Sequence, residues 1–240
     1  MDIYQAMKAP NIFVNETIAR HGMPPPNIPA NLSETYSQCY EDIILDSLLR
    51  AYIKRNGAPT SIAFVEIGAN HPVCTSSSYL FRRKYNMIAY LVEANPKLIP
   101  ALEKFRPNDV VIHAAVVNHD LPTVDFYISA NNETSSLDDR FVEIRTPGIE
   151  QKITVPTIRA NRVLDMATAE AMVLLSVDVE GLDLQILQDI DFDTHRPVFI
   201  IVEPSEDYQP GSTNAIIDFL KTKGYNVVAE TDVNLIFQLA

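Results

Sequence analysis

The chain has 240 residues, 47% of them hydrophobic, which is enough for one α/β domain with a sizeable core. Its net charge of −12, from 31 Asp and Glu against 19 Lys and Arg, argues against nucleic acid as a partner, because basic side chains neutralise the phosphates. No apolar run approaches the roughly 20 residues that span a bilayer, and the first 30 residues lack the features of a signal peptide. We therefore expect a cytoplasmic protein without a membrane span.

The amino-terminal 35 residues differ from the rest of the chain. They contain "HGMPPPNIPA", whose consecutive prolines exclude a helix or a central strand. The next stretch, "SETYSQCYEDIILDSLLRAYIKRNG", predicts an amphipathic helix with Ser33 or Ser37 as its N-cap and Gly57 at its end. We expect a proline-rich arm over residues 1–35 and one domain over residues 36–240. Two cysteines without C-x-x-C spacing predict neither a disulfide framework nor a structural metal site.

Strand and helix patterns then alternate along the chain. Strands are predicted at 62–67, 88–93 and 110–117, with helices near 75–85 and 97–105 between them. Such alternation indicates right-handed βαβ crossovers and a parallel sheet. Strands as continuously apolar as "IAFVEI" are typical of a sheet with helices on both faces. The sequence predicts a doubly wound α/β core.

The alternation breaks between residues 118 and 160. Here "TVDFYIS" and "QKITVPTI" predict two strands that flank a long polar segment, which we expect to border the active cleft. The pattern resumes with helices at 159–169, 182–189 and 213–223 and strands at 172–178, 198–203, 225–229 and 234–239. The last two strands have no helix between them and predict an antiparallel hairpin.

Polar or special residues fall at the ends of several predicted strands: Glu66, Gly68, Asn70, Glu93, Asp178 and Glu203. Ligands of open α/β sheets bind beyond the carboxyl ends of the strands, so these residues predict a site. Only one glycine follows the first strand, and the three-glycine fingerprint that cradles a dinucleotide pyrophosphate is absent.

The two glutamates suggest the ligand. Glu66 would repel a phosphate at the first turn, whereas Glu93 can accept both hydroxyls of a ribose. Together they indicate a nucleoside with positive charge and no phosphate, as in S-adenosylmethionine. The simpler alternative is a pair of solvated carboxylates. Ala114 is a candidate wall of the adenine pocket, whereas His113 before it is more simply a core histidine.

The sequence resembles the FkbM family of S-adenosylmethionine-dependent methyltransferases from about Tyr36 to Glu203. The matching stretches are "YSQCYEDIILDSLL", "FVEIGAN", "AYLVEANP", "ETSSL", "LLSVDVEGLDLQIL" and "RPVFIIVE". The resemblance implies a class I methyltransferase fold, which is Rossmann-like, with a mostly parallel sheet and an antiparallel carboxyl-terminal strand. It also implies methyl transfer to an oxygen, often a sugar hydroxyl in a natural product or a surface polysaccharide.

The resemblance assigns roles to individual residues. Gln38 and Asp42 match an S-Q-x-x-E-D element expected near the methionine end of the cofactor, and His71 departs from the small or acidic residue expected after "GAN". The other matches are Glu66, Gly68 and Asn70 to the cofactor loop, Glu93 to the ribose-binding acid, and Asp178, Glu180 and Gly181 to a D-x-E-G element.

Asp178 and Glu180 are the catalytic candidates. A sugar hydroxyl is a poor nucleophile at neutral pH, so it needs a general base or a metal ion. Either carboxylate could be the base, or the pair could hold Mg²⁺ together with Glu203. The alternative for Glu180 is to cap the helix that begins at Leu182.

Other functions stay open at this point. A nicotinamide-dependent oxidoreductase would also use Glu93, although the missing glycines count against it. A non-catalytic binding module would keep the same fold. The segment "NNETSSLDD" offers hydroxyls and amides suited to a sugar or glycan acceptor. The proline-rich arm could close over the acceptor or over a neighbouring subunit of a homo-oligomer.

Overall fold

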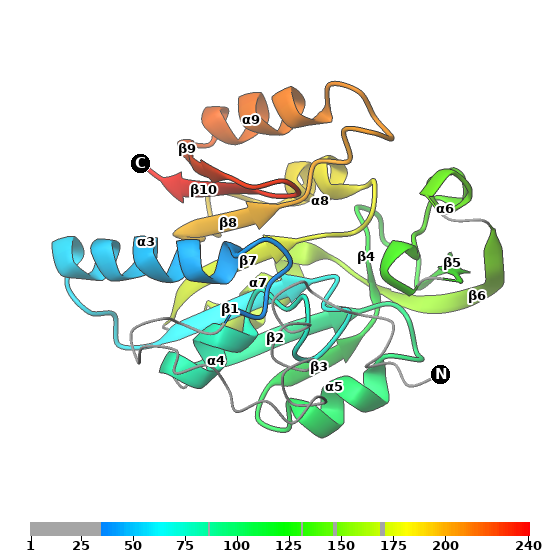
Figure 1. The fold of residues 1–240 in the computed structure, drawn as a ribbon, viewed down its shortest axis with the longest axis horizontal. Helices are drawn as coiled ribbons and strands as arrows, with labels where there is room; N and C mark the ends of the chain where they lie inside the picture. The colour runs from blue at the N-terminus through cyan, green and yellow to red at the C-terminus, as the bar shows by residue number, and fades with distance from the viewer. Residues whose placement is uncertain (1–34, 86, 131, 146–147, 169–170) are drawn as a thin grey trace, which may run out of the picture.

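The computed structural model describes residues 35–85, 87–130, 132–145, 148–168 and 171–240 (Figure 1). The predicted arm, except for its last residue, and the candidate cap Ser33 lie outside the described residues. No helix in the described part of the chain is both long enough and apolar enough to cross a bilayer.

A sheet of seven strands forms the centre of the domain, in the order β3-β2-β1-β7-β8-β10-β9. The first five strands in this order are parallel, and β10 is antiparallel to both of its neighbours. The bounds are β1 Ile62–Ile67, β2 Ile88–Glu93, β3 Val110–His113, β7 Met172–Val177, β8 Phe199–Val202, β9 Tyr225–Glu230 and β10 Leu235–Leu239. The predicted doubly wound, mostly parallel sheet with its antiparallel carboxyl-terminal strand is confirmed.

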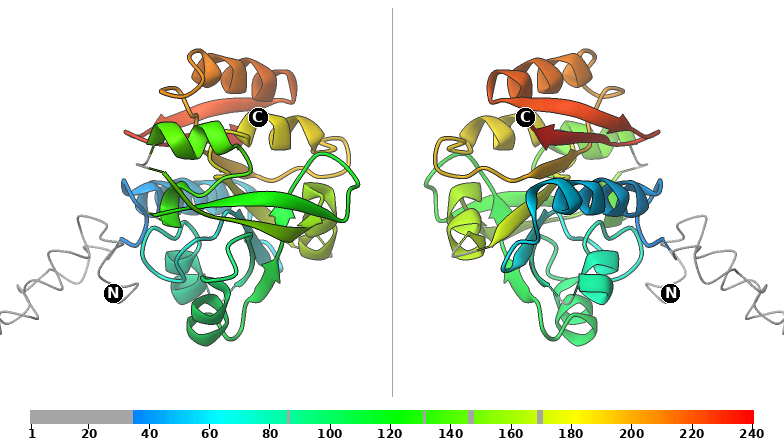
Figure 2. Two further views of the ribbon diagram at one scale, coloured as in Figure 1. Left: turned by 90° about the vertical axis from the view of Figure 1, so that its right-hand side faces the viewer. Right: turned by 90° about the vertical axis from the view of Figure 1, so that its left-hand side faces the viewer.

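Two groups of helices cover the opposite faces of this sheet, and each buries its own apolar cluster. One group contributes Leu45, Leu49, Phe81 and Leu102 to the first cluster; the other contributes Val163 and further apolar residues to the second. The groups are α3 Glu41–Asn56, α4 Tyr79–Tyr85 and α5 Ile99–Phe105 on one side, and α7 Ala160–Ala167, α8 Asp183–Asp189 and α9 Ser212–Thr222 on the other (Figure 2). Burial on both faces explains why the central strands are continuously apolar.

The predicted strand at 110–117 is divided in two in the structure. β3 pairs with β2 and ends at His113, and the chain then leaves the main sheet at Ala114. β4, Ala115–Val116, pairs with β6, Ile149–Ile158, in a second sheet of order β4-β6-β5. The expectation of one continuous strand was wrong because its two halves pair with different partners.

The segment between β5, Thr123–Ser129, and β6 is not a plain polar loop. It contains a 3₁₀ turn, η1 Asn132–Thr134, and a helix, α6 Asp139–Arg145, that the sequence pattern did not predict. Phe141 and Val142 are buried beneath this helix. Figure 1 shows α6 and the small sheet beside the carboxyl ends of the central strands.

Two predicted helix starts were misplaced, and local hydrogen bonds explain both. α3 begins at Glu41 with Tyr40 at its N-cap, although the Ser37 hydroxyl still accepts from the amide of Asp42 at 3.1 Å. α4 begins at Tyr79 rather than near 75, because residues 76–78 turn back toward a buried carboxylate. Serine side chains compete with helical hydrogen bonds in this way.

Candidate functional site

A cavity lies at the carboxyl ends of β1, β2 and β7, and its empty space, which opens to solvent, is about 590 Å³. Ligands of open α/β sheets bind at this edge, beyond the carboxyl ends of the parallel strands. Six of the residues singled out in the sequence line it: Gly68, Asn70, Glu93, Ala114, Asp178 and Glu180. The structure brings these six together from four separate stretches of the chain.

The turn after β1 lies directly against the end of β7. Gly68 has φ +83°, and a Cβ atom at this position would lie 1.8 Å from the carbonyl oxygen of Asp178. Only glycine allows so close an approach. The amides of Gly68 and Ala69 both donate to the carbonyl of Val92, at 2.9 and 3.0 Å, so the turn is fixed to β2 as well.

Glu93 is the last residue of β2, and backbone amides orient its buried carboxylate. Oε2 accepts from the amide of Asn70, and Oε1 accepts from the amide of Asn95, both at 2.7 Å. Burial raises the pKa of Glu93, while these amides lower it. Each carboxylate oxygen has a second acceptor position. The carboxylate can therefore accept two further hydrogen bonds, as the two hydroxyls of a ribose require.

One wall of the cavity is apolar. Ala114, Ala115 and Val116 supply part of it, because the chain leaves the main sheet at this point. Phe126 and Leu137 supply another part from the region of β5. Such a wall suits a flat heterocycle better than it suits a phosphate. The segment between β5 and β6, through Glu133, Ser135 and Leu137, does border this cavity, as its length and position predicted.

Asp178 follows β7 directly and has an unused acceptor. Its Oδ1 is buried and has no hydrogen-bond partner among the described residues, and the same is true of Asn70 Oδ1. Burial first, then the neighbouring Glu203 and Glu180 carboxylates, raise the pKa of Asp178 well above 3.8. Buried polar atoms are rarely left unpaired in folded proteins. Two such acceptors beside one cavity fit a ligand that carries donors or positive charge.

Glu180 lines the same cavity in a strained conformation. Its φ is +55°, a left-handed value that costs a non-glycine residue roughly 1–3 kcal/mol. Burial first, then Glu203 and Asp183, raise the pKa of Glu180 well above 4.5, and Arg145 opposes them. A carboxylate whose pKa is raised in this way is suited to accept a proton near neutral pH.

The alternative in which Glu180 caps the following helix is contradicted, because α8 begins at Asp183 and no side chain forms a cap hydrogen bond at its start. Asp183 instead fixes the turn that precedes the helix, since its Oδ1 accepts from the amide of Val179 at 2.9 Å and its Oδ2 accepts from that of Gly181 at 3.3 Å. Asp183 is buried, and burial raises its pKa to about 7, although both amides lower it. Sequence reasoning missed this residue, since an acidic side chain in the first turn of a helix looks like an ordinary dipole partner.

Three residues expected around the cofactor do not line this cavity. Glu66 lies behind the turn: it accepts from the Ser76 hydroxyl at 3.1 Å, the Ser77 amide at 2.7 Å and the Ser78 hydroxyl. Burial raises the pKa of Glu66, and the Arg106 guanidinium lowers it.

The amino-terminal element also lies away from the cavity. Asp42 is buried and accepts from the amide of Tyr36 and the hydroxyls of Thr35 and Ser37, at 2.7 to 2.9 Å, while Gln38 is exposed. In the structure, Asp42 fixes the residues that precede α3. The S-Q-x-x-E-D match in the sequence could not distinguish such a structural contact from a contact with the cofactor.

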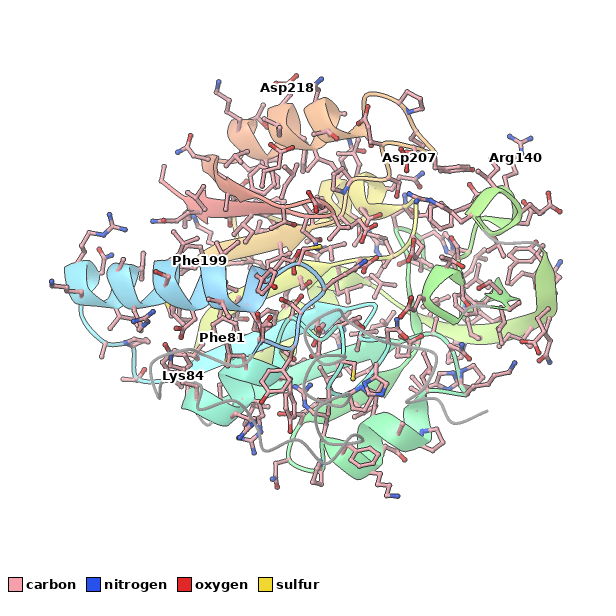
Figure 3. The ribbon with its side chains drawn as sticks, in the orientation of Figure 1. Phe81, Lys84, Arg140, Phe199, Asp207 and Asp218 are labelled. Atoms are coloured by element: carbon pink, nitrogen blue, oxygen red, sulfur yellow. The ribbon has the colours of Figure 1, made fainter. Side chains whose placement is uncertain are left out.

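A second cavity, with empty space of about 700 Å³, lies on the same edge between α6, the end of β8 and the β9–β10 hairpin. It is lined by Glu203, Asp207 and Asp232 among other carboxylates, with Arg145 as a cation (Figure 3 labels Asp207). Among the neighbouring carboxylates, Glu203 contributes most to the raised pKa values of Asp178 and Glu180. The sequence analysis grouped Glu203 with the residues of the first cavity, but the structure places it here. The other lining residues were not predicted, because they come from distant segments with no shared motif.

The geometry gives no support for Mg²⁺ held by the three carboxylates. Glu203 lines the second cavity, whereas Asp178 and Glu180 line the first. Within the described ranges, no group of three or more His, Cys, Asp or Glu side chains is placed to hold a metal ion.

The sequence matches the model of the methyltransferase FkbM domain over residues 66–227. The chain belongs to the FkbM methyltransferase family. The matched range begins at Glu66 and includes every residue that lines the first cavity. The protein is therefore a methyltransferase of the S-adenosylmethionine-dependent class. No curated protein matches the chain.

Three solved structures are similar to the chain at low identity. A protein in the NADB-Rossmann superfamily from Streptococcus agalactiae is 14% identical, with 80% of this chain and 68% of that chain covered and a TM-score of 0.39. Precorrin-6y C5,15-methyltransferase from Geobacter metallireducens is 14% identical over 80% and 87%, with a TM-score of 0.40. M. jannaschii TYW2 in complex with AdoMet is 10% identical over 83% and 77%, with a TM-score of 0.35. The family assignment rests on the sequence match.

Proposed function

We propose that this FkbM family member transfers a methyl group from S-adenosylmethionine to a hydroxyl of a sugar, in a surface polysaccharide or a glycosylated natural product. The observation that carries the proposal is the pairing of Asp178, with its unused buried oxygen, and Glu180 in one cavity with the amide-oriented Glu93. This arrangement joins a nucleoside site to a pair of candidate bases.

The residues of the first cavity fit the cofactor. Glu93 would accept the ribose hydroxyls, and the wall at Ala114 and Phe126 would contact the adenine ring. The unpaired oxygens of Asn70 and Asp178 would accept from the positively charged methionine end. Because Gly68 has no side chain, the turn after β1 packs against the Asp178 backbone, and both residues form part of the cavity wall.

Glu180 and Asp178 are the proposed bases for the acceptor. When bound, S-adenosylmethionine would supply an activated methyl group on a positively charged sulfur. A carboxylate oxygen of Glu180 or Asp178 would accept the proton of the acceptor hydroxyl as its oxygen takes the methyl group, and S-adenosylhomocysteine would be the other product. The raised pKa of each carboxyl favours proton transfer near neutral pH. Alignment of the hydroxyl within the cavity can lower the barrier by roughly 7–11 kcal/mol.

The lining of the second cavity supports the proposal that the acceptor is polyhydroxylated. It places the carboxylate of Glu203 beside the side-chain amide of Asn234, and the oxygens of both groups can accept from sugar hydroxyls. The Glu41 carboxylate fixes this wall, since Oε1 accepts from the Thr231 hydroxyl at 2.8 Å and the Asn234 amide group at 3.2 Å.

The test begins with calorimetric titration of S-adenosylhomocysteine into the wild type and the Glu93→Gln variant, with NADH as control ligand. We expect micromolar binding that Glu93→Gln weakens by about 10- to 100-fold, since a charged acceptor for two hydroxyls is lost. Absence of wild-type binding contradicts the cofactor assignment, and binding of NADH instead favours a nicotinamide-dependent oxidoreductase.

Acceptor screening then separates an enzyme from a binding module. Methyl transfer to sugar hydroxyls is measured with Mg²⁺ and with a chelator, for the wild type, Asp178→Asn and Glu180→Gln. We expect both variants to lose turnover. Glu180→Gln should keep its affinity for S-adenosylhomocysteine, whereas Asp178→Asn should also weaken it, because Asp178 would contact the methionine end. A chain that binds the cofactor product but methylates no acceptor is a silent family member. Deletion of residues 1–30 in the same assay, with sedimentation of both chains, tests the proposed roles of the arm in acceptor binding and in a homo-oligomer.

A further inference from the structure

Ser136 contacts the backbone of Glu180 although the two residues are 44 positions apart in the sequence. Its hydroxyl donates to the carbonyl oxygen of Glu180 at 2.7 Å and accepts from the amide of Asp138 at 3.1 Å. The hydroxyl therefore donates one hydrogen bond and accepts another, and both partners are backbone groups. This is a specific contact between the segment that precedes β6 and the D-x-E-G element.

Ser136 is itself rigidly held. Its side chain and backbone are 1% exposed, and it forms a two-way bridge with Tyr127 of β5. The Tyr127 amide donates to the Ser136 carbonyl at 2.9 Å, and the Ser136 amide donates to the Tyr127 carbonyl at 3.1 Å. The hydrogen bond to Glu180 therefore starts from a point that is anchored to the small sheet.

A second residue holds the next carbonyl of the same turn. The side-chain amide of Gln209, from the loop between β8 and α9, donates to the carbonyl of Gly181 at 3.1 Å. Gly181 has φ +98°, and a Cβ atom there would lie 2.9 Å from the ring of Phe141 and 3.4 Å from that of Tyr208. The turn is thus enclosed between α6 and the β8–α9 loop.

The turn that these contacts hold contains Glu180, whose backbone conformation is strained. Asp183 accepts from the amides on either side of Glu180, while Ser136 and Gln209 donate to the carbonyls of Glu180 and Gly181. Without the donors, the backbone of the turn can rotate about φ of Glu180 toward an unstrained conformation. Such a rotation changes the direction of the Glu180 side chain, because φ and ψ set where Cβ points.

We propose that Ser136 and Gln209 are positioning residues that hold the Glu180 carboxylate toward the cavity through the backbone of its turn. This rests on the proposed role of Glu180 as a base. Neither residue lines the first cavity, whereas Glu133 and Ser135, on the same segment as Ser136, do. A ligand that contacts this segment therefore also acts on the residue that orients the base.

Hydrogen exchange of the ligand-free protein tests the structural half of the proposal. Ser136→Ala and Gln209→Ala should each speed exchange at the amides of Val179 and Gly181 by about tenfold or more, because local opening governs exchange. Thr168→Ala is the matched control: its hydroxyl also donates to a backbone carbonyl, that of Leu164 at 2.8 Å, at the end of α7. Unchanged exchange at residues 179–181 in both test variants overturns the proposal.

A double-mutant cycle on turnover tests the functional half. Ser136→Ala should lower kcat by about 10- to 100-fold, as misplacement of a reacting group does, with the affinity for S-adenosylhomocysteine changed less than about threefold. In the Glu180→Gln background the same substitution should have no further effect, because its action passes through Glu180. Thr168→Ala should leave kcat unchanged in both backgrounds.

Each remaining outcome has a defined meaning. Equal losses in the presence and absence of the Glu180 carboxylate show that Ser136 acts by another route and overturn the proposal, as does full activity of Glu180→Gln. If Ser136→Ala does not fold, the exposed Gln209 carries the same cycle. Failure of the wild type to bind S-adenosylhomocysteine contradicts the proposed function instead, and the exchange measurement still decides whether the turn is held as described.

Discussion

Gly68 and Asp178 are in direct backbone contact: a Cβ atom on Gly68 would lie 1.8 Å from the Asp178 carbonyl oxygen. The Asp178 amide in turn donates to the carbonyl of Ile67 at 3.0 Å. The end of β7 is therefore attached to the turn after β1, and Asp178 takes its position relative to Asn70 from this contact. Because any side chain at position 68 would overlap the Asp178 backbone, the geometry of the site requires glycine there.

Gly68→Ala should disrupt the site and the fold around it. We expect a loss of about 3 kcal/mol or more in the free energy of unfolding and no measurable binding of S-adenosylhomocysteine, because the new methyl group would overlap the Asp178 backbone. Chemical denaturation and calorimetry measure the two effects. Gly211→Ala is the control: Gly211 has φ +92° with no atom within 4 Å of an added Cβ, so only the conformational cost of about 1–2 kcal/mol applies. Equal effects of the two substitutions would contradict this account.

Glu66→Gln should affect stability rather than cofactor binding. Glu66 accepts from Ser76, Ser77 and Ser78 behind the turn, so the substitution removes part of a buried network and costs roughly 1–3 kcal/mol. We expect a Tm lower by several degrees and an affinity for S-adenosylhomocysteine within about threefold of the wild type. Thermal melts and calorimetry on one sample measure both. The opposite result, an unchanged Tm with affinity lost as in Glu93→Gln, would restore Glu66 to the cofactor loop.

His71 should be neutral between pH 5 and 8. Burial lowers its pKa to about 4, and its Nδ1 accepts from the amides of Val73 and Cys74 at 3.1 and 2.8 Å. These contacts require the tautomer with hydrogen on Nε2. Two-dimensional NMR of the imidazole nitrogens at pH 6 should show this tautomer without a change on titration to pH 8. A protonated ring at pH 6 would contradict this assignment.

Asp183 should make the protein less stable as the pH rises. Its pKa is about 7 in the native state against 3.8 ordinarily, so the native state holds the proton more tightly. The stabilisation is complete below about pH 4 and is lost as the pH rises to about 7, by a few kcal/mol at most. The Tm advantage of the wild type over Asp183→Asn should therefore shrink between pH 5 and 7.5.

The control for this pH dependence is Asp218→Asn, because Asp218 points outward from α9 (Figure 3) and is exposed. Its difference from the wild type should stay constant across the same range. A wild-type advantage over Asp183→Asn that grows with pH would mean that Asp183 is ionised in the native state.

Local pattern was enough to predict most of the main sheet. Continuous apolar runs such as those of β1 and β7 can be buried only between two layers of helices, so their place in a parallel sheet followed from composition and spacing. The helix α6 was missed because it has seven residues and its sequence, "DRFVEIR", is mostly polar. Two buried side chains, Phe141 and Val142, stabilise it against the small sheet, and tertiary packing of this kind overrides weak propensity.

The candidate site was likewise predicted only in part from the sequence. The ends of the strands identified Glu93 and Asp178 as neighbours, since parallel strands present their carboxyl ends at one edge. Glu180 was added by the D-x-E-G element of the family resemblance. The same reasoning from strand ends treated Glu66 as their equal. Glu66 pairs with Leu91, two residues before Glu93, so its side chain points to the same face as that of Glu93 but lies further from the carboxyl edge of the sheet.

The sequence by itself determined the alternation of strands and helices, the family, and the edge of the sheet at which the polar residues meet, because these depend on the local period and on short motifs. Only the tertiary structure decided which carboxylates face the cavity, that Asp183 fixes the amides on either side of Glu180, and that Ser136 holds the Glu180 turn. These are contacts between groups whose positions are set by packing of the whole domain, and no spacing within a single segment encodes the direction in which such a side chain points.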